Sequence, residues 1–174
     1  MNRTLIHSTR DKYFNEAWDL YIKAFHIDER REIESQNQIM KSEYYHFEVI
    51  TLNQQLIGFI AWWELDQLIF IEHFATLDQH RGKGYGKLIL NEFIEQFKGL
   101  IILEVEFPNT SINQRRIGFY ERLGFELNTH QYQQLSLRKG GPKVDLLVMS
   151  YPTKIEESEL KKFEMEFTRH NFSF

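Results

Sequence analysis

The sequence has no cysteine among its 174 residues. This absence excludes disulfide bonds, thiolate zinc sites and a covalent cysteinyl intermediate. No apolar run approaches the ~18–20 residues that a membrane-spanning helix needs, and residues 1–12 lack the apolar core of a signal peptide. We therefore expect a cytoplasmic protein that does not associate with membranes.

Positive charge is also scarce. The chain has 21 Lys and Arg against 25 Asp and Glu, which gives a net charge of −4. General nucleic-acid binding needs a basic surface, so we expect no nucleic-acid partner. Because no acidic cluster has the spacing of metal ligands, we also expect no metal site.

Aromatic residues, in contrast, are abundant: 15 Phe, 8 Tyr and 3 Trp. They indicate a well-filled core or a pocket for a flat ligand. Hydrophobic periodicity predicts strands at 3–8, 44–52, 55–65, 67–77, 100–107, 125–137 and 144–150, and helices at 11–25, 28–42, 88–97, 112–123 and 154–170. This order predicts an α/β (α+β) domain over 1–151 with a mixed sheet of six to seven strands, followed by a helical tail over 152–174. Gly58, inside a strand, predicts a bulge or a close backbone approach.

A glycine-rich stretch, QHRGKGYGK at 79–87, lies between a predicted strand and a predicted helix. Helix N-termini carry free N–H groups, and glycine lets the backbone approach an anion closely. The stretch therefore predicts a phosphate or pyrophosphate cradle, with a plain connecting turn as the alternative. The P-loop pattern fails because Lys87 is followed by Leu88. The dinucleotide pattern G-x-G-x-x-G also fails on spacing.

A different pattern fits. Gln79-x-x-Gly82-x-Gly84 matches the Q/R-x-x-G-x-G/A signature of the GNAT N-acetyltransferase superfamily. Residues 113–126, NQRRIGFYERLGFE, are similar to the second signature of that family, with Asn113, Tyr120 and Gly124-Phe125 at the matching positions. The chain most resembles uncharacterised bacterial members of the superfamily.

The resemblance implies the GNAT fold and acetyl-coenzyme A as cofactor. It implies that the amides of the glycine loop bind the pyrophosphate, and that main-chain groups of Ala75 and Leu77 bind the pantetheine arm along a splayed strand. Arg116 stands where the family often has a small residue. The cofactor-binding residues predicted in this way are Phe74, Ala75, Thr76, Leu77, Gln79, His80, Arg81, Gly82, Lys83, Gly84, Tyr85, Gly86, Lys87, Asn113, Arg116 and Tyr120.

Acetyl transfer to an amine needs a base for the amine proton and an acid for the leaving thiolate. The resemblance implies Tyr120 as the acid, and a core aromatic is the alternative. Glu72 and Glu104, each mid-strand among apolar residues, are the candidate bases, and an ion pair to a nearby Arg is the alternative for each. Strict alternation points His73 away from Glu72, which suits a core histidine. We expect Glu72→Gln to cost more activity than Glu104→Gln.

The acceptor is expected to be a small-molecule or peptide amine. The family usually places it against the first two helices, here residues 25–40, together with Trp62 and Trp63. Glu29, Glu32 and Glu34 would suit a cationic amine there, with a solvated charged face as the alternative. The alternative to an enzyme is a non-catalytic acyl-coenzyme A-binding or sensor module. A monomer and a homodimer both remain compatible with the sequence.

Overall fold

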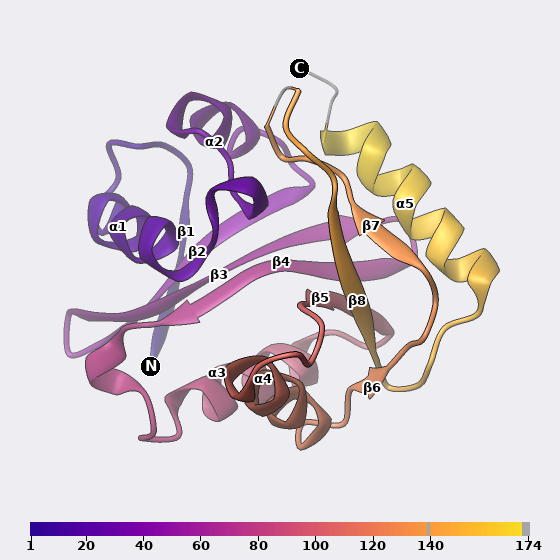
Figure 1. The fold of residues 1–174 in the computed structure, drawn as a ribbon. Coiled ribbons are helices and arrows are strands. Elements are labelled where there is room, and N and C mark those ends of the chain that lie inside the picture. Colours follow the sequence, from indigo (N-terminus) through magenta and orange to yellow (C-terminus); the bar gives the residue numbers. More distant parts are fainter. Residues whose placement is uncertain (139, 172–174) are drawn as a thin grey trace.

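The computed structural model describes residues 1–138 and 140–171. A single mixed sheet runs through the molecule, with helices on both faces (Figure 1). The strands are β1 (Asn2–Ile6), β2 (Tyr45–Leu52), β3 (Gln55–Leu65), β4 (Leu68–Thr76), β5 (Leu100–Val105), β6 (Glu126–Leu127), β7 (Tyr132–Gln134) and β8 (Val144–Tyr151). The α-helices are α1 (Phe14–Ala24), α2 (Ile33–Ile39), α3 (Tyr85–Gln96), α4 (Ser111–Glu121) and α5 (Glu157–Asn171).

The sheet order is β1-β2-β3-β4-β5-β8-β6, and β7 also pairs with β8. The β4–β5 pair is parallel, whereas the other pairs are antiparallel. The predicted mixed sheet is confirmed, with eight strands instead of six to seven. Within the described residues, no helix is long and apolar enough to cross a membrane.

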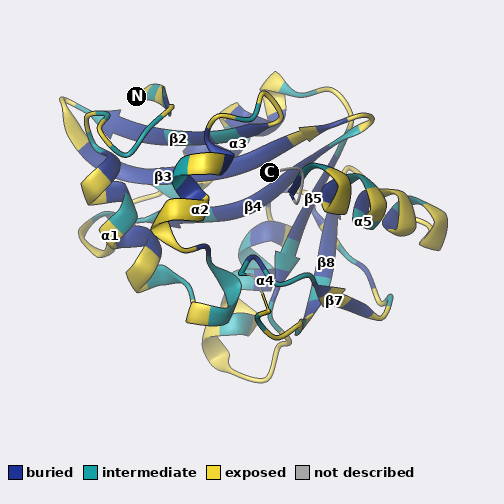
Figure 2. Cartoon of the chain, turned by 90° about the horizontal axis from the view of Figure 1, so that it is seen from above, coloured by how far each residue is buried: buried dark blue, intermediate teal, exposed yellow. Residues whose placement is uncertain are grey.

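Each face of the sheet has its own hydrophobic core, because most strand residues are buried while the helices expose one side (Figure 2). One core, under α1, α2 and α5, contains Phe14, Phe47, Phe59 and Phe70 among others. The other, under α3 and α4, contains Leu90, Phe93, Ile101 and Met149 among others. The high aromatic content is largely explained by these two cores.

The predicted hairpin of β2 and β3 turns at Asn53 and Gln54, which have φ of 50° and 63°. Such left-handed pairs match the twist of a two-residue hairpin. Both features predicted for Gly58 are present. The β2–β3 register shifts next to it, and a Cβ built at this glycine would lie 2.2 Å from the carbonyl oxygen of Ala75. Gly58 therefore lets β3 and β4 approach closely.

One strand was predicted over 125–137, but the structure has two short strands, β6 and β7, in that range. The break falls at Asn128, which is 2% exposed. Its side chain donates to the carbonyl of Val148 and to Ser150 Oγ, and accepts from the amide of Ile155. These hydrogen bonds end the strand at Leu127 and fix the segment that leads to α5.

Helix α5 packs against the sheet over the same core as α1 and α2 (Figure 1). Phe163 and Phe167 are 0% and 1% exposed. Their rings lie 4.7 Å and 5.1 Å from that of Phe70, between centroids, and Phe167 also meets Trp63 edge-on. The residues predicted as a tail therefore fill part of the core.

The parallel pairing of β4 and β5 is short. Leu68–Ile71 pairs with Leu100–Leu103, and the register ends there, although β4 continues to pair with β3 as far as Thr76. A bulge lies at the same point, because the residues opposite Ala61 and Trp62 on β4 are His73 and Ile71, leaving Glu72 as an extra residue. Since bulges bend strands, β4 diverges from β5 beyond Glu72.

Candidate functional site

The glycine loop forms the start of α3. Gly82 and Gly84 have φ of 74° and 83°, a region that favours glycine. Gly84 is the N-cap of α3, and a Cβ built on either glycine meets no atom within 4 Å. The loop thus presents the free N–H groups of a 12-residue helix to open space, which is the arrangement that binds anions.

Basic side chains surround this helix start. Arg81 Nη1 lies 2.8 Å from Asp78 Oδ1, and Lys23 pairs with the other oxygen of that carboxylate. Lys83 and Lys87 have no ion-pair partner within the described part of the chain. These two lysines can therefore pair with an anionic ligand without breaking an existing ion pair.

The remaining loop residues predicted to bind the cofactor lie beside the glycines. Gln79 and His80 belong to a short 3-10 helix, Asp78–His80, and His80 meets the ring of Tyr85 edge-on at 5.6 Å between centroids. The signature spacing also occurs two residues further on, as Arg81-x-x-Gly84-x-Gly86. Because Gly84 caps the helix, this second register, which the sequence analysis missed, places the signature on the helix start.

The main chain of β4 corrects one expectation. The amide of Leu77 donates to the carbonyl of Ile57 at 2.9 Å, and its carbonyl accepts from the amide of His80 at 2.8 Å. Leu77 is therefore not free to bind a ligand through its main chain, and neighbouring Ala75 has its carbonyl against Gly58. Since main-chain groups alternate in direction along a strand, those of Phe74 and Thr76 point away from β3, toward β5.

Asn113 and Arg116 lie in the first turns of α4. The side-chain amide of Asn113 donates to the carbonyl of Phe107 at 3.0 Å, and its backbone amide donates to the hydroxyl of Thr110, the N-cap. Arg116 Nη1 donates to Glu106 Oε2 at 2.6 Å. Both residues thus brace the segment between β5 and α4 at the point where β4 and β5 have parted.

Tyr120 lies in the last turn of α4, facing the core under α3 and α4. Its ring packs edge-on against Phe119 and Phe125, at 5.3 Å and 5.8 Å between centroids. Burial raises the pKa of the phenol to about 12, although the positive charge of Arg116 opposes this. Its hydroxyl has no hydrogen bond to any residue that the structure describes. Tyr120 is therefore a protonated donor at neutral pH with no other partner to satisfy.

Glu72, a candidate base, is held in a buried ion pair. Its carboxylate binds the guanidinium of Arg31, with both side chains at most 2% exposed, and accepts from Trp63 Nε1 at 3.1 Å. Burial alone would raise its pKa, but the charge of Arg31 and the surrounding hydrogen bonds outweigh burial and lower the pKa of Glu72 to about 2. Contrary to expectation, Glu72 is poorly suited to be the base, because its carboxylate is already stabilised as an anion.

The predicted direction of His73 is wrong. His73 Nδ1 lies 3.3 Å from Glu72 Oε2, and its Nε2 lies 2.7 Å from the carbonyl of Glu29. Both side chains point to the same face because the bulge at this point breaks the alternation. His73 is 3% exposed and packs against Tyr21 and Phe25, which is consistent with a core histidine.

Glu104, the other candidate base, has a different environment. Its two oxygens accept hydrogen bonds from Tyr132 Oη and Gln134 Nε2, both on β7. Burial raises its pKa to about 8, against the effect of these bonds, and the negative charges of Glu72 and Glu29 raise it further. Within the described residues no Arg or Lys pairs with it. A carboxylate with a pKa near the working pH is suited to proton transfer.

The acid and base candidates lie on opposite faces of the sheet. Tyr120 belongs to the core under α3 and α4, whereas Tyr132, the partner of Glu104, belongs to the core under α1, α2 and α5. The unpaired ends of β4 and β5 lie between the two. The pairing of β4 with β5 ends at Ile71 and Leu103, and a ligand would have to enter this opening in the sheet to meet groups on both faces.

The expected acceptor residues are only partly supported. Trp62 and Trp63 are 4% and 0% exposed and belong to the cores, so they cannot line an open acceptor site. Glu32 binds Arg138 at 3.2 Å. Glu29 remains near the site, because its charge acts on Glu104 and its pKa is raised by burial and by Glu106.

Three functional neighbours were missed in the sequence: Arg31, Tyr132 and Gln134. Arg31 also donates to Asn171 at the end of α5 and so ties the segment before α2 to both β4 and α5. No local pattern announces these residues, since their partners are 28 to 140 positions away. Across the described residues, no group of three or more His, Asp or Glu side chains could hold a metal ion.

The geometry defines an α/β protein with an open, glycine-rich helix start beside two parting parallel strands. A family model described as the acetyltransferase (GNAT) family matches residues 10–125. A GNAT-family protein from Bacteroides thetaiotaomicron is 30% identical, with a TM-score of 0.87, over 96% of both chains. The chain belongs to the GNAT family.

More distant solved structures share the fold. The ribosomal-protein-S18-alanine N-acetyltransferase of Escherichia coli is 18% identical, with a TM-score of 0.59, over 90% of this chain and 97% of that one. An acetyltransferase of Bacillus subtilis, solved with CoA, is 16% identical, with a TM-score of 0.58, over 86% and 96%. No curated protein matches the sequence.

Proposed function

We propose that the protein transfers an acetyl group from acetyl-coenzyme A to a primary amine, by direct attack in a ternary complex. The observation that carries this proposal is the arrangement of three features around one opening in the sheet. A glycine-rich helix start lies at the end of β4, a protonated phenol with no partner lies on one face, and a carboxylate with a raised pKa lies on the other.

The residues of the loop fit the diphosphate of such a donor. Gly82 and Gly84 leave space where a side chain would stand, the helix N–H groups are free, and Lys83 and Lys87 add positive charge. The main-chain groups of Phe74 and Thr76 face the unpaired side of β4, where a pantetheine arm could pair as an added strand would. The bound donor would supply the thioester.

The side chains divide the proton chemistry between them. Glu104 as a carboxylate takes the proton that the amine loses when its nitrogen bonds to the acyl carbon. Tyr120 gives its phenol proton to the sulfur as the carbon–sulfur bond breaks, and the phenolate takes a proton back from water once the products leave. With Glu72 held as an anion by Arg31, Glu104 is the better base. This reverses the order expected from the sequence.

The test mixes the protein with acetyl-coenzyme A and a panel of amines, including polyamines, lysine and peptides with free N-termini. Release of the coenzyme A thiol is followed with a chromogenic disulfide reagent that reacts with free thiols. The chain has no cysteine and adds no thiol background. Release that depends on an amine supports the proposal. Saturable binding of coenzyme A without release for any amine would instead indicate a non-catalytic binding module.

A further inference from the structure

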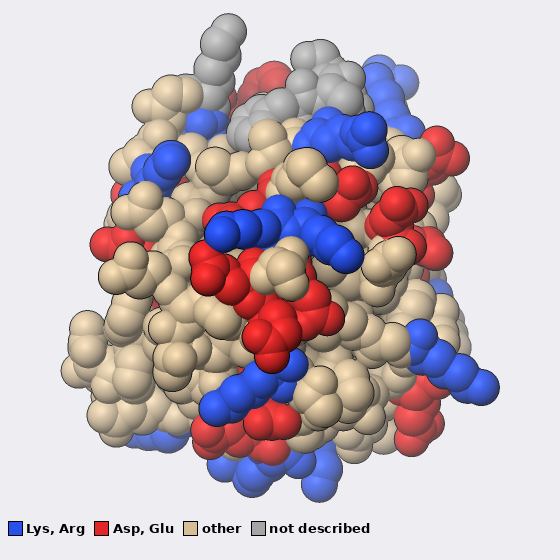
Figure 3. All heavy atoms as spheres, turned by 90° about the vertical axis from the view of Figure 1, so that its right-hand side faces the viewer, with Lys and Arg blue, Asp and Glu red and all other residues tan. Residues whose placement is uncertain are grey.

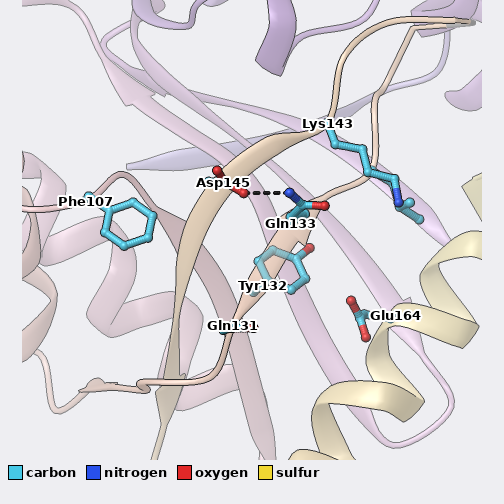
Figure 4. A pocket seen from close by; sticks show the side chains of 8 residues that line it. Phe107, Gln131, Tyr132, Gln133, Lys143, Asp145 and Glu164 are labelled. Atoms are coloured by element: carbon cyan, nitrogen blue, oxygen red, sulfur yellow. Dashed lines mark hydrogen bonds between the residues drawn. The ribbon is translucent and has the colours of Figure 1, made fainter.

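A cavity of about 650 Å³ opens beside β7, β8 and α5, away from the glycine loop. Tyr132, Lys143, Asp145 and Glu164 are among the residues that line it, with Phe107 at its other side (Figure 4). Acidic and basic side chains are interleaved over this side of the molecule (Figure 3). The cavity itself is lined by side chains of both signs, Lys143, Asp145 and Glu164.

Tyr132 connects this cavity to Glu104. Its hydroxyl donates to Glu104 Oε1, and the same residue lines the cavity. In Figure 4 its phenol oxygen lies on the side of the ring toward Glu164 and Lys143. The other donor to Glu104, Gln134, is 3% exposed and is not part of the cavity lining. Of the two residues that donate to Glu104, Tyr132 lines the cavity and Gln134 does not.

A partly buried base that its substrates would cover needs a route by which its proton leaves. Each turnover of the proposed reaction would leave Glu104 as a neutral acid, which has to lose its proton before the next amine can react. During turnover the opening between β4 and β5 is filled by the donor and the acceptor. A second route through the protein would let the base recover without waiting for that opening to clear.

Resting on the proposed function, we propose that Tyr132 is a proton relay that returns protons from Glu104 to water in the cavity beside α5. The proton of the Glu104 acid passes to the phenol oxygen of Tyr132 while the phenol proton passes to a cavity water. The carboxylate is regenerated, the phenol is again neutral, and the water carries the proton out.

Burial and nearby negative charges keep both groups of the relay protonated. Burial, then Glu72 and Glu29, raise the pKa of Glu104, and Glu164 and Glu72 add to the effect of burial on Tyr132. Burial and the carboxylate of Glu104 raise the pKa of the Tyr132 phenol well above its usual range. The phenol therefore stays protonated and transmits by exchanging one proton for another.

The test compares Tyr132→Phe with Gln134→Leu in full-length protein under saturating substrates. Each variant removes one hydrogen bond to Glu104, but only Tyr132→Phe removes the path to the cavity. We expect kcat of Tyr132→Phe to fall about a hundredfold with KM nearly unchanged, at the lower end of the ~10²–10⁴-fold range for a positioned proton-transfer group. Millimolar imidazole should restore most of that rate, but should not restore the rate of Gln134→Leu.

Asp145→Asn serves as a matched cavity control. Asp145 lines the same cavity but accepts from Gln133 at 2.8 Å, so its variant should keep the wild-type rate. The relay would be overturned if imidazole restored kcat equally in Tyr132→Phe and Gln134→Leu, or if Tyr132→Phe kept the wild-type kcat. Either result would leave the acetyltransferase proposal in place. Absence of turnover in the wild-type protein with every amine would overturn the proposed function itself.

Discussion

Glu72 and Glu104 stand on neighbouring parallel strands and point to the same face of the sheet, where Glu72 is buried and Glu104 is partly buried. Arg31 neutralises Glu72 and lowers its pKa to about 2, whereas Glu104 receives only two neutral donors and its pKa rises to about 8. The difference shows that burial does not by itself make a base. The charge of the partner decides whether a buried carboxylate holds an anion or exchanges a proton.

The largest expected effect of this difference is on activity. Glu104→Gln keeps the size and the hydrogen-bonding capacity of the side chain but cannot accept the amine proton. We expect kcat to fall ~10²–10⁴-fold, as for loss of a positioned base, with coenzyme A affinity unchanged. Steady-state thiol release and calorimetric binding measure the two quantities. A variant within threefold of the wild-type rate would contradict the assignment of the base.

Glu72→Gln is expected to act mainly on stability. The substitution leaves the guanidinium of Arg31 buried without a counter-charge, which costs about 3–5 kcal/mol of unfolding free energy. Urea unfolding measures this loss, with Glu64→Gln, an exposed glutamate on β3, as the control. Where the variant is folded, its kcat should remain near wild type. A fully stable variant with a collapsed kcat would instead make Glu72 the base.

Tyr120→Phe tests the acid on the opposite face. Because the phenol has no other partner within the described residues, its loss should leave the fold intact and lower kcat by roughly 10²–10³-fold. Affinity for coenzyme A should change little. Since its pKa is about 12, the wild-type enzyme should show no alkaline loss of activity from this group below about pH 10. A wild-type rate in the variant at all pH values would remove Tyr120 from the mechanism.

The two glutamates should also differ in how stability depends on pH. The folded pKa of Glu104 lies above its ordinary value of 4.5, so the native state binds more protons than the unfolded state. The stability that this proton contributes at low pH is lost as pH rises from about 4.5 to about 8. Glu104→Gln should therefore gain stability relative to wild type over that interval. Glu72 has the opposite sign, and its contribution disappears as pH falls from 4.5 toward 2. Urea midpoints of the wild type and Glu104→Gln at pH 5 and pH 8.5 test the prediction for Glu104. If the two proteins differed in midpoint by the same amount at both pH values, the prediction would be contradicted.

The smallest expected effect lies at the glycine loop. Lys83→Ala and Lys87→Ala each remove an exposed positive charge that would pair with the phosphates, worth ~0.2–1 kcal/mol, so coenzyme A affinity should fall at most about fivefold. Competitors that lack the diphosphate, such as pantetheine, should bind both variants as tightly as they bind the wild type. Equal losses for pantetheine and coenzyme A would place the diphosphate elsewhere.

Local sequence patterns were enough to predict most of the fold. Periodicity located the strands and the main helices, the Asn53-Gln54 turn marked the hairpin, and Gly58 marked a bulge. Each of these features depends on neighbours within a few residues. The glycine loop was found for the same reason, because a strand, a turn and a helix start are adjacent in the chain.

The environment of the candidate bases could not be predicted in this way. The bulge at Glu72 turns His73 to the same face, and its position depends on the register with β3. Arg31 reaches Glu72 across 41 positions, and β7 brings Tyr132 and Gln134 to Glu104 across 28 and 30. Two strand glutamates that look alike in the sequence thus acquire opposite properties from distant partners.

The pH dependence of kcat/KM tests the assignment of Glu104 most directly, measured with an acceptor amine that is already neutral at pH 6. The wild-type profile should rise to a plateau with an apparent pKa of about 8, and the residual activity of Glu104→Gln should lack that rise. The same rise in both proteins, at similar rates, would show that another group takes the proton.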